Sequence, residues 1–279
     1  METIFSLMDK LPFDFISYSF MKHALLATLL VTPLFGILST MVVESRMAFF
    51  SDSLGHGAFT GIAVGAVCGI FSPKISLLIF SMIFALLITY IKHKTRMGAD
   101  TVIGVFSSTA VALGLMLMTY GGEFQKYAKY LIGDLLSIKS EEILALSVVF
   151  ALTFLIWAFM YNKLLIGAIS PSVARSREIS PIMYEAAFAS VLAVIVAISI
   201  EWVGILLINS LLVLPAAAAR NVTNNIRSYH LCSMLFAVLS GVTGLIAAFY
   251  ADTSAGATIV MMGAALFFVT LFLRKRFIK

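Results

Sequence analysis

Long stretches without a charged residue constrain the fold of this chain more than any other feature. Nine windows lack Asp, Glu, Lys and Arg, and most are about 17–22 residues long, the length that an α-helix needs to cross a bilayer. They cover residues 24–43, 53–73, 75–91, 101–122, 143–162, 186–200, 202–219, 231–251 and 253–273. Only 12% of the residues are charged, whereas soluble domains carry about twice that share. The sequence therefore predicts an all-α, polytopic integral membrane protein.

Two of the nine windows depart from a regular span. The window 186–200 is short, and 202–219 follows it after a single residue. Pro215 removes a helical hydrogen bond inside the later window, which favours a broken helix there. We therefore expect about eight regular transmembrane helices and one short or broken segment, all in a single integral membrane domain. Residues 1–20 are expected to form an amphipathic lead-in on the membrane surface.

Basic residues predict the orientation, because cytoplasmic loops carry an excess of Lys and Arg. If all nine windows cross the membrane, 13 of the 19 basic residues fall on one side, among them Arg46, Lys163 and Arg274. The remaining six are Lys10, Lys22, Lys74, Lys126, Lys129 and Lys139. The N-terminus is then predicted outside and the C-terminus in the cytoplasm. This asymmetry accounts for most of the net charge of +5, so nucleic acid is not an expected partner.

An Asp and a His stand four residues apart in the second window, in the segment SDSLGHGAFTGIAVGAVCG at 51–69. This spacing places Asp52 and His56 on one face of a helix, within reach of a common ion. The mixed oxygen and nitrogen pair suits Zn²⁺ or Mn²⁺, and ionisable groups inside a span default to function because they are costly to keep there. Two donors are too few for a permanent structural site, so the pair is interpreted as a transient site. Two structural alternatives remain: Asp52 as a helix N-cap and His56 as a buried imidazole bonded to a carbonyl.

Small and polar residues around this pair predict how its helix is used. Glycines recur every four residues and predict a ridge for close helix packing, formed by Gly57, Gly61, Gly65 and Gly69. Thr60 shares the ridge of the Asp–His pair and is a candidate for lining an ion path. Asn209, in the middle of a later window, either lines the path or bonds across helices.

Missing motifs narrow the classes of function. No Gly is followed by Lys, so the chain has no P-loop for ATP, and it contains no H-E-x-x-H zinc-protease motif. An enzyme is therefore not expected. The segment LPAAAARNVTNNIRSYH at 214–230 changes abruptly from apolar to polar on the predicted cytoplasmic side. Either a short amphipathic helix that docks a partner or a plain loop fits this pattern.

Five stretches together resemble the permeases of metal-type ABC importers, which move zinc, manganese or iron(II) with a separate ATPase and a binding protein. They are RMAFFSDSLGHGAFTGIAVG (46–65), ADTVIGVFSSTAVALGL (99–115), YLIGDLLSI (130–138), EWVGILLINSLLVLPAAAAR (201–220) and FYADTSAGATIV (249–260). The resemblance implies that Asp52 and His56 coordinate metal in the translocation path. It also implies a cytoplasmic coupling element at 215–228, where the candidates for contact with the ATPase are Pro215, Arg220, Asn221 and Arg227.

The same resemblance implies the partners and the cargo. A second copy of the chain would complete the pore, a cytoplasmic ATP-binding subunit would drive it, and an extracytoplasmic metal-binding protein would deliver the ion through the lipid-embedded complex. No permanently bound cofactor is expected, and zinc is narrowly favoured over manganese as cargo because imidazole is a favoured zinc ligand. Three alternatives stay open: an ion-gradient-driven metal transporter, which would need no docking helix; an ABC permease for a metal chelate, which would have little use for a bare-ion ligand pair; and a membrane enzyme.

Overall fold

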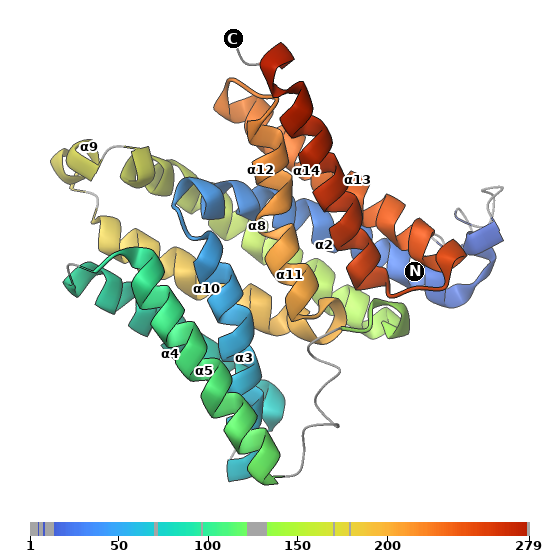
Figure 1. The fold of residues 1–279 in the computed structure, drawn as a ribbon, viewed down its shortest axis with the longest axis horizontal. Helices are drawn as coiled ribbons and strands as arrows, with labels where there is room; N and C mark the ends of the chain where they lie inside the picture. The colour runs from blue at the N-terminus through green and yellow to red at the C-terminus, as the bar shows by residue number, and fades with distance from the viewer. Residues whose placement is uncertain are drawn as a thin grey trace. The chain divides into compact units, whose positions relative to one another are not determined.

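The computed structural model describes residues 14–277 except 70–71, 96, 122–132, 170 and 179, together with Phe5 and Met8. Every regular element among these residues is a helix (Figure 1). In chain order the elements are η1 (Asp14–Ser17), α2 (Ser19–Glu44), α3 (Ala48–Cys68), α4 (Pro73–Lys94), α5 (Ala99–Gly121), η2 (Leu135–Ser137), α8 (Ser140–Ile169), α9 (Pro171–Ser176), α10 (Pro181–Val203), α11 (Ile205–Leu211), α12 (Leu214–Arg220), α13 (Ile226–Ala251) and α14 (Ala255–Phe277). Of the predicted lead-in at 1–20, residues 1–4, 6–7 and 9–13 lie outside the described residues.

The predicted fold class, an all-α chain with many membrane spans, is confirmed. Seven described helices are long and apolar enough to cross a membrane, namely α2, α4, α5, α8, α10, α13 and α14. Helix α3 has 21 residues, enough for an eighth crossing, but it is more polar because it carries Asp52 and His56. The window that looked short, 186–200, belongs to the regular 23-residue α10.

The predicted broken segment is also present. A turn at Leu212 and Val213 separates α11 from α12, and each of these helices has seven residues. Pro215 lies in the first turn of α12, where a missing backbone N–H breaks no helical hydrogen bond. The proline therefore starts a new short helix instead of kinking a long one.

One compact unit consists of Glu44–Ile132 and Leu155–Asn209. In this unit α3 packs against α4 and α5, and α10 packs against α4 and α3. Three of the four predicted ridge glycines face α4. A Cβ atom would lie 2.8 Å from Phe84 at Gly57, 2.8 Å from Phe80 at Gly61 and 2.6 Å from Ser76 at Gly65. Helix α4 can approach α3 this closely only because these positions have no side chain.

The fourth ridge glycine, Gly69, has a different role. It follows the last residue of α3 and has a φ of +64°, in the left-handed region that glycine adopts without strain. Its N–H donates to the carbonyl of Gly65 at 3.2 Å, and no described atom lies within 4 Å of the position of a Cβ. Gly69 therefore ends the helix and does not pack against a neighbour as predicted, because the helical ridge stops one residue before it.

The other compact unit consists of Met1–Val43, Gly133–Phe154 and Ser210–Lys279. Helix α13 packs along α14, and α12 packs against both of them (orange and red in Figure 1). Helix α2 meets α13 at Gly241, where a Cβ would lie 2.4 Å from Cγ2 of Thr32. The turn after α12 leads directly into α13. The side chain of Asn225 caps the start of α13, because it accepts a hydrogen bond from the backbone N–H of Ser228 at 2.8 Å.

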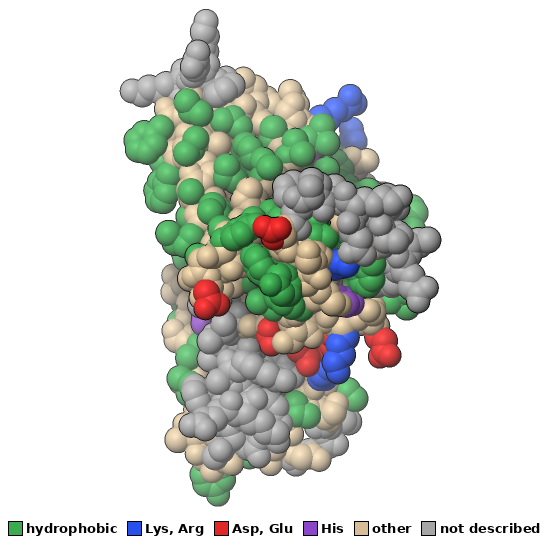
Figure 2. Space-filling view, turned by 90° about the vertical axis from the view of Figure 1, so that its right-hand side faces the viewer, with side chains coloured by type: hydrophobic (Ala, Val, Ile, Leu, Met, Phe, Trp, Pro, Cys, Tyr) green, Lys and Arg blue, Asp and Glu red, His purple; other side chains and the backbone are tan. Residues whose placement is uncertain are grey.

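Apolar side chains cover much of the described surface (Figure 2). On α8 they form a stripe at helical spacing in which every side chain is more than half exposed: Leu144, Val148, Leu152, Leu155 and Phe159. A soluble monomer rarely exposes so continuous an apolar surface. The surface therefore suits lipid or the apolar surface of another subunit.

Candidate metal site

Helix α3 holds Asp52 and His56 one turn apart, as the sequence predicts. Oδ2 of Asp52 lies 3.7 Å from Nε2 of His56, and the two side chains remain 50% and 37% exposed, respectively. Because α3 begins at Ala48, Asp52 is the fifth residue of the helix and His56 lies about 12 Å along it. Asp52 is therefore not an N-cap, His56 is not a buried imidazole, and both structural alternatives fail.

The separation of the two donor atoms is compatible with one shared ion. Bonds from Zn²⁺ to imidazole nitrogen and carboxylate oxygen are about 2.0–2.2 Å, so two donors of one tetrahedral ion lie about 3.4 Å apart, and neighbouring donors of an octahedral ion about 3.0 Å. The observed 3.7 Å exceeds both values, so the two atoms would draw slightly closer together around an ion of either geometry. In the described part of the chain, no group of three or more His, Cys, Asp and Glu side chains is arranged to hold a metal. Within the described residues, Asp52 and His56 therefore form a pair and not a larger cluster of such side chains.

The structure brings a third residue, Asn209, to this pair. Its Nδ2 donates a hydrogen bond to Oδ1 of Asp52 at 2.5 Å, across 157 residues of sequence. Of the two predicted roles for Asn209, bonding across helices is the one that the geometry displays, and it does so at the candidate site itself.

Gly55 makes this contact possible and was not singled out from the sequence. A Cβ at Gly55 would lie 2.6 Å from Cγ2 of Ile205 and 3.4 Å from Oδ1 of Asn209. The chain around Ile205 and Asn209 can thus lie against α3 only where α3 lacks a side chain. The available signal was a glycine directly before the histidine in SLGHG, but it falls outside the four-residue ridge and its partner is distant in sequence.

Thr60 does not line the exposed side of the helix, in contrast to the prediction. It is completely buried, and its hydroxyl donates to the backbone carbonyl of Ala110 in α5 at 2.5 Å. Four residues along an α-helix turn about 400°, so each step along the ridge rotates about 40° away from the starting face. Two such steps separate Thr60 from Asp52, and they carry the hydroxyl into the interface between α3 and α5.

The predicted ATPase-coupling residues divide into two pairs. Arg220, at the end of α12, and Arg227, in the first turn of α13, are exposed. Pro215 and Asn221 are buried, and Nδ2 of Asn221 lies 3.4 Å from Oγ1 of Thr270 in α14. The segment 215–228 therefore consists of the end of α12, a turn and the start of α13. The guanidinium groups of Arg220 and Arg227 lie at its surface, and the side chains of Pro215 and Asn221 are buried.

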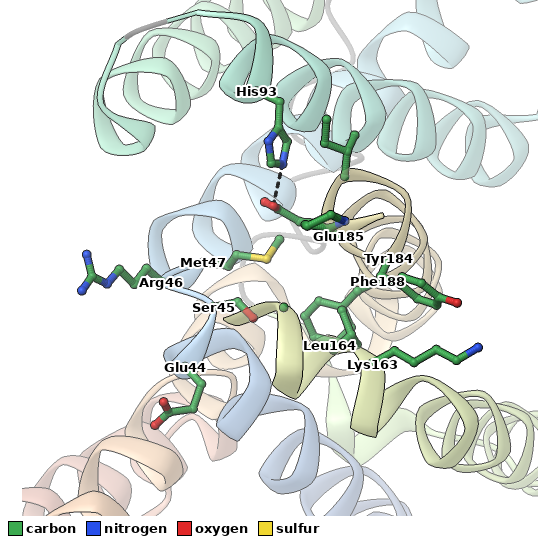
Figure 3. A pocket seen from close by; sticks show the side chains of 13 residues that line it. Glu44, Ser45, Arg46, Met47, His93, Lys163, Leu164, Tyr184, Glu185 and Phe188 are labelled. Atoms are coloured by element: carbon green, nitrogen blue, oxygen red, sulfur yellow. Dashed lines mark hydrogen bonds and ion pairs between the residues drawn. The ribbon is translucent and has the colours of Figure 1, made fainter. Parts of the chain in front are cut away.

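A separate cavity of about 620 Å³ lies in the unit that contains α3, and its lining includes Met47, Leu164, Glu185 and Phe188 (Figure 3). The carboxylate of Glu185 binds Nζ of Lys92 at 2.5 Å and Nε2 of His93 at 2.7 Å. Both carboxylate oxygens are therefore engaged, and the cluster joins α10 to the end of α4. Figure 3 shows the side chain of Lys163 pointing away from the centre of this cavity.

Comparisons with known proteins agree with this architecture. The sequence model of the ABC 3 transport family matches residues 17–274. The high-affinity zinc uptake system membrane protein ZnuB of Haemophilus influenzae is 30% identical over 256 residues, which cover 91% of this chain and 97% of that protein. The manganese transport system membrane protein MntC of Halalkalibacterium halodurans is 27% identical and covers 95% and 92%. In structure, PsaBC from Streptococcus pneumoniae, solved with a Fab, has a TM-score of 0.81 at 24% identity and covers 99% and 98%.

Proposed function

Because this chain belongs to the ABC 3 transport family, we propose that it is the membrane-spanning permease subunit of an ATP-driven importer for a divalent transition-metal ion. Relatives in this family are permeases of metal-uptake systems and not enzymes, and ATP hydrolysis belongs to a separate subunit. Zinc is favoured narrowly over manganese as the cargo. The observation that carries the proposal is the Asp52–His56 pair, which stays partly exposed on a helix whose neighbouring residues, from Ser53 to Gly55 and from Gly57 to Ala63, are buried.

Two copies of the chain complete the metal site in this proposal. Each copy contributes one carboxylate oxygen and one imidazole nitrogen, and both side chains are open enough to face a second copy. Two chains together supply four donors, the usual number around Zn²⁺. A site divided between two subunits also provides a means of release, because the four donors separate when the subunits move apart.

In this proposal the ATPase subunits, which supply the energy, dock on the segment 215–228. Arg220 and Arg227 expose guanidinium groups that suit carboxylates of a cytoplasmic ATPase, and the buried Pro215 and Asn221 hold the segment on its own helices. Closure of the ATPase subunits on ATP then switches the two permease copies between outward-open and inward-open states. An extracytoplasmic binding protein delivers the ion to the outward-open state.

The proposed membrane is the cytoplasmic, or inner, membrane, with the N-terminus outside and the C-terminus in the cytoplasm. Ion pairs in the α3-containing unit agree with the antiparallel course of α4 and α10 in this topology, and its direction is favoured by the excess of Lys and Arg on one predicted side. Lys74 binds Glu201 at 2.6 Å, joining the start of α4 to the end of α10, and Lys92 binds Glu185 at the opposite ends of the same two helices. Both members of each pair are thus on one predicted side of the membrane, as an antiparallel arrangement of α4 and α10 requires.

Uptake of radioactive zinc and manganese tests the proposal. The permease is reconstituted in vesicles with its ATPase and binding protein, and native protein is compared with Asp52→Ala and His56→Ala. We expect ATP-dependent uptake of one ion that falls to background in both variants while the complex still assembles. The matched control is Asp100→Ala, which removes an exposed carboxylate at the start of α5 and is expected to transport normally.

Unchanged uptake in both site variants would contradict the assigned site, and uptake that needs no ATPase would contradict an ATP-driven importer. Competition by a metal chelate, with no uptake of free ion, would favour the chelate permease instead.

A further inference from the structure

The hydrogen bond from Asn209 makes the two oxygens of Asp52 chemically different. Oδ1 accepts the amide N–H of Asn209 at 2.5 Å, whereas Oδ2 lies 3.7 Å from Nε2 of His56. The orientation of the amide is fixed by its partner, because the opposite orientation would place two oxygens against each other with no proton between them. Asp52 therefore presents Oδ2 on the side of His56, and its other oxygen is already occupied.

The amide of Asn209 is costly to keep, which argues against a packing role alone. Its Oδ1 atom is buried and accepts no hydrogen bond in the described part of the chain. A buried acceptor without a partner destabilises the folded protein, and an apolar side chain of similar size would avoid this cost. The packing around Gly55 also holds the amide close to α3. The contact between Asn209 and Asp52 is thus built into the fold.

A carboxylate that binds through one oxygen and a carboxylate that binds through two suit different metals. Zn²⁺ takes four donors in a tetrahedron, whereas Mn²⁺ favours octahedral sites rich in oxygen. With one oxygen from each Asp52 and one nitrogen from each His56, two chains provide four donors. If both oxygens of each Asp52 were available, the same two chains would provide six.

We propose that Asn209 is a specificity-determining residue, which holds Asp52 as a one-oxygen ligand and so keeps the shared site four-coordinate and selective for zinc over manganese. This inference rests on the proposed function, since it assigns a role within the metal site that function requires. Asn209 acts through Asp52 and is a positioning residue in this assignment.

Cobalt(II) bound to the purified two-chain permease tests the assignment, because four-coordinate Co²⁺ absorbs visible light far more strongly than six-coordinate Co²⁺. Native protein is expected to show the strong four-coordinate spectrum. Asn209→Ala frees Oδ1 of Asp52, and the isosteric Asn209→Asp replaces the donor with a second carboxylate. In both variants we expect a weaker spectrum of higher coordination number and a zinc-over-manganese preference lower by roughly 10-fold.

The controls separate this inference from the proposed function. Thr89→Ala removes another buried polar group, a hydroxyl that donates to the carbonyl of Ala85 at 2.9 Å, and should leave the cobalt spectrum unchanged. Asp52→Ala should abolish the cobalt spectrum. If it does so but both Asn209 variants keep the native spectrum and the native metal preference, the specificity role is overturned and the metal site stands. If native protein binds no cobalt, or Asp52→Ala binds it normally, the site and the inference both fail.

Discussion

Asp52 is the residue on which the site depends, because its two carboxylate oxygens serve two different neighbours. One oxygen accepts a hydrogen bond from the amide of Asn209, and the other lies on the side of His56. The two neighbours are placed in different ways. His56 is set by the turn of α3, and Asn209 by the close approach that Gly55 permits. A single missing side chain thus connects helix packing to metal chemistry.

Substitution of that glycine gives a prediction at the residue scale. In Gly55→Ala the new methyl group would lie 2.6 Å from Cγ2 of Ile205, a branched side chain that cannot rotate the contact away. The segment carrying Asn209 must move, so we expect a loss of about 1–3 kcal/mol in stability and roughly 10-fold weaker zinc binding. Thermal unfolding in detergent and equilibrium zinc titration measure the two effects.

Gly104→Ala is the matched control, because it changes the same residue type inside a helix where nothing lies within 4 Å of the added Cβ. It should leave zinc binding unchanged and raise stability by about 0.5–1 kcal/mol. Equal effects of the two substitutions would show that Gly55 is not specially placed.

At the scale of elements, the short turn between α11 and α12 links two regions along the chain: the end of α11, which carries Asn209, and the segment proposed to dock the ATPase. Asn209 stands near the end of α11, and Arg220 at the end of α12 is only 11 positions further on. Between them lies the turn at Leu212 and Val213. The segment that bonds Asp52 therefore runs directly into the segment proposed to meet the ATPase.

Reversing one exposed charge tests that element. In Arg227→Glu the guanidinium proposed to meet acidic groups of the ATPase becomes a carboxylate, which should repel them. We expect ATPase affinity to fall by an order of magnitude, roughly 10-fold, with zinc binding to the permease unchanged. Co-purification with the ATPase measures the affinity. Arg177→Glu, an exposed arginine just after α9, serves as control. An identical loss in both variants would mean that general charge, and not this segment, governs docking.

Most helices could be predicted from the sequence because bilayer thickness sets their length and charge-free windows mark them. The pairing of Asp52 with His56 was also accessible, since it follows from four-residue spacing. The bond to Asn209 was not, because it joins residues 157 positions apart and depends on how α11 meets α3. Thr60 was misplaced because a ridge of four-residue steps turns gradually away from its first face.

At the scale of the whole molecule, this chain is one half of the proposed transporter. One chain provides the spans, the segment proposed to dock the ATPase and the two proposed metal donors. In the described part of the chain those donors form no larger cluster with other His, Cys, Asp and Glu side chains. An ion held by only two donors would be bound weakly, so in the proposed mechanism the second copy serves capture of the ion as well as the pore.

The stoichiometry of zinc bound to the purified permease distinguishes a site shared between two copies from a site within one chain. Equilibrium titration, with the number of chains per complex determined on the same sample, should give one tightly bound ion for every two chains, and none in Asp52→Ala or His56→Ala. One ion per chain, or tight binding that survives both substitutions, would contradict a site shared between two copies.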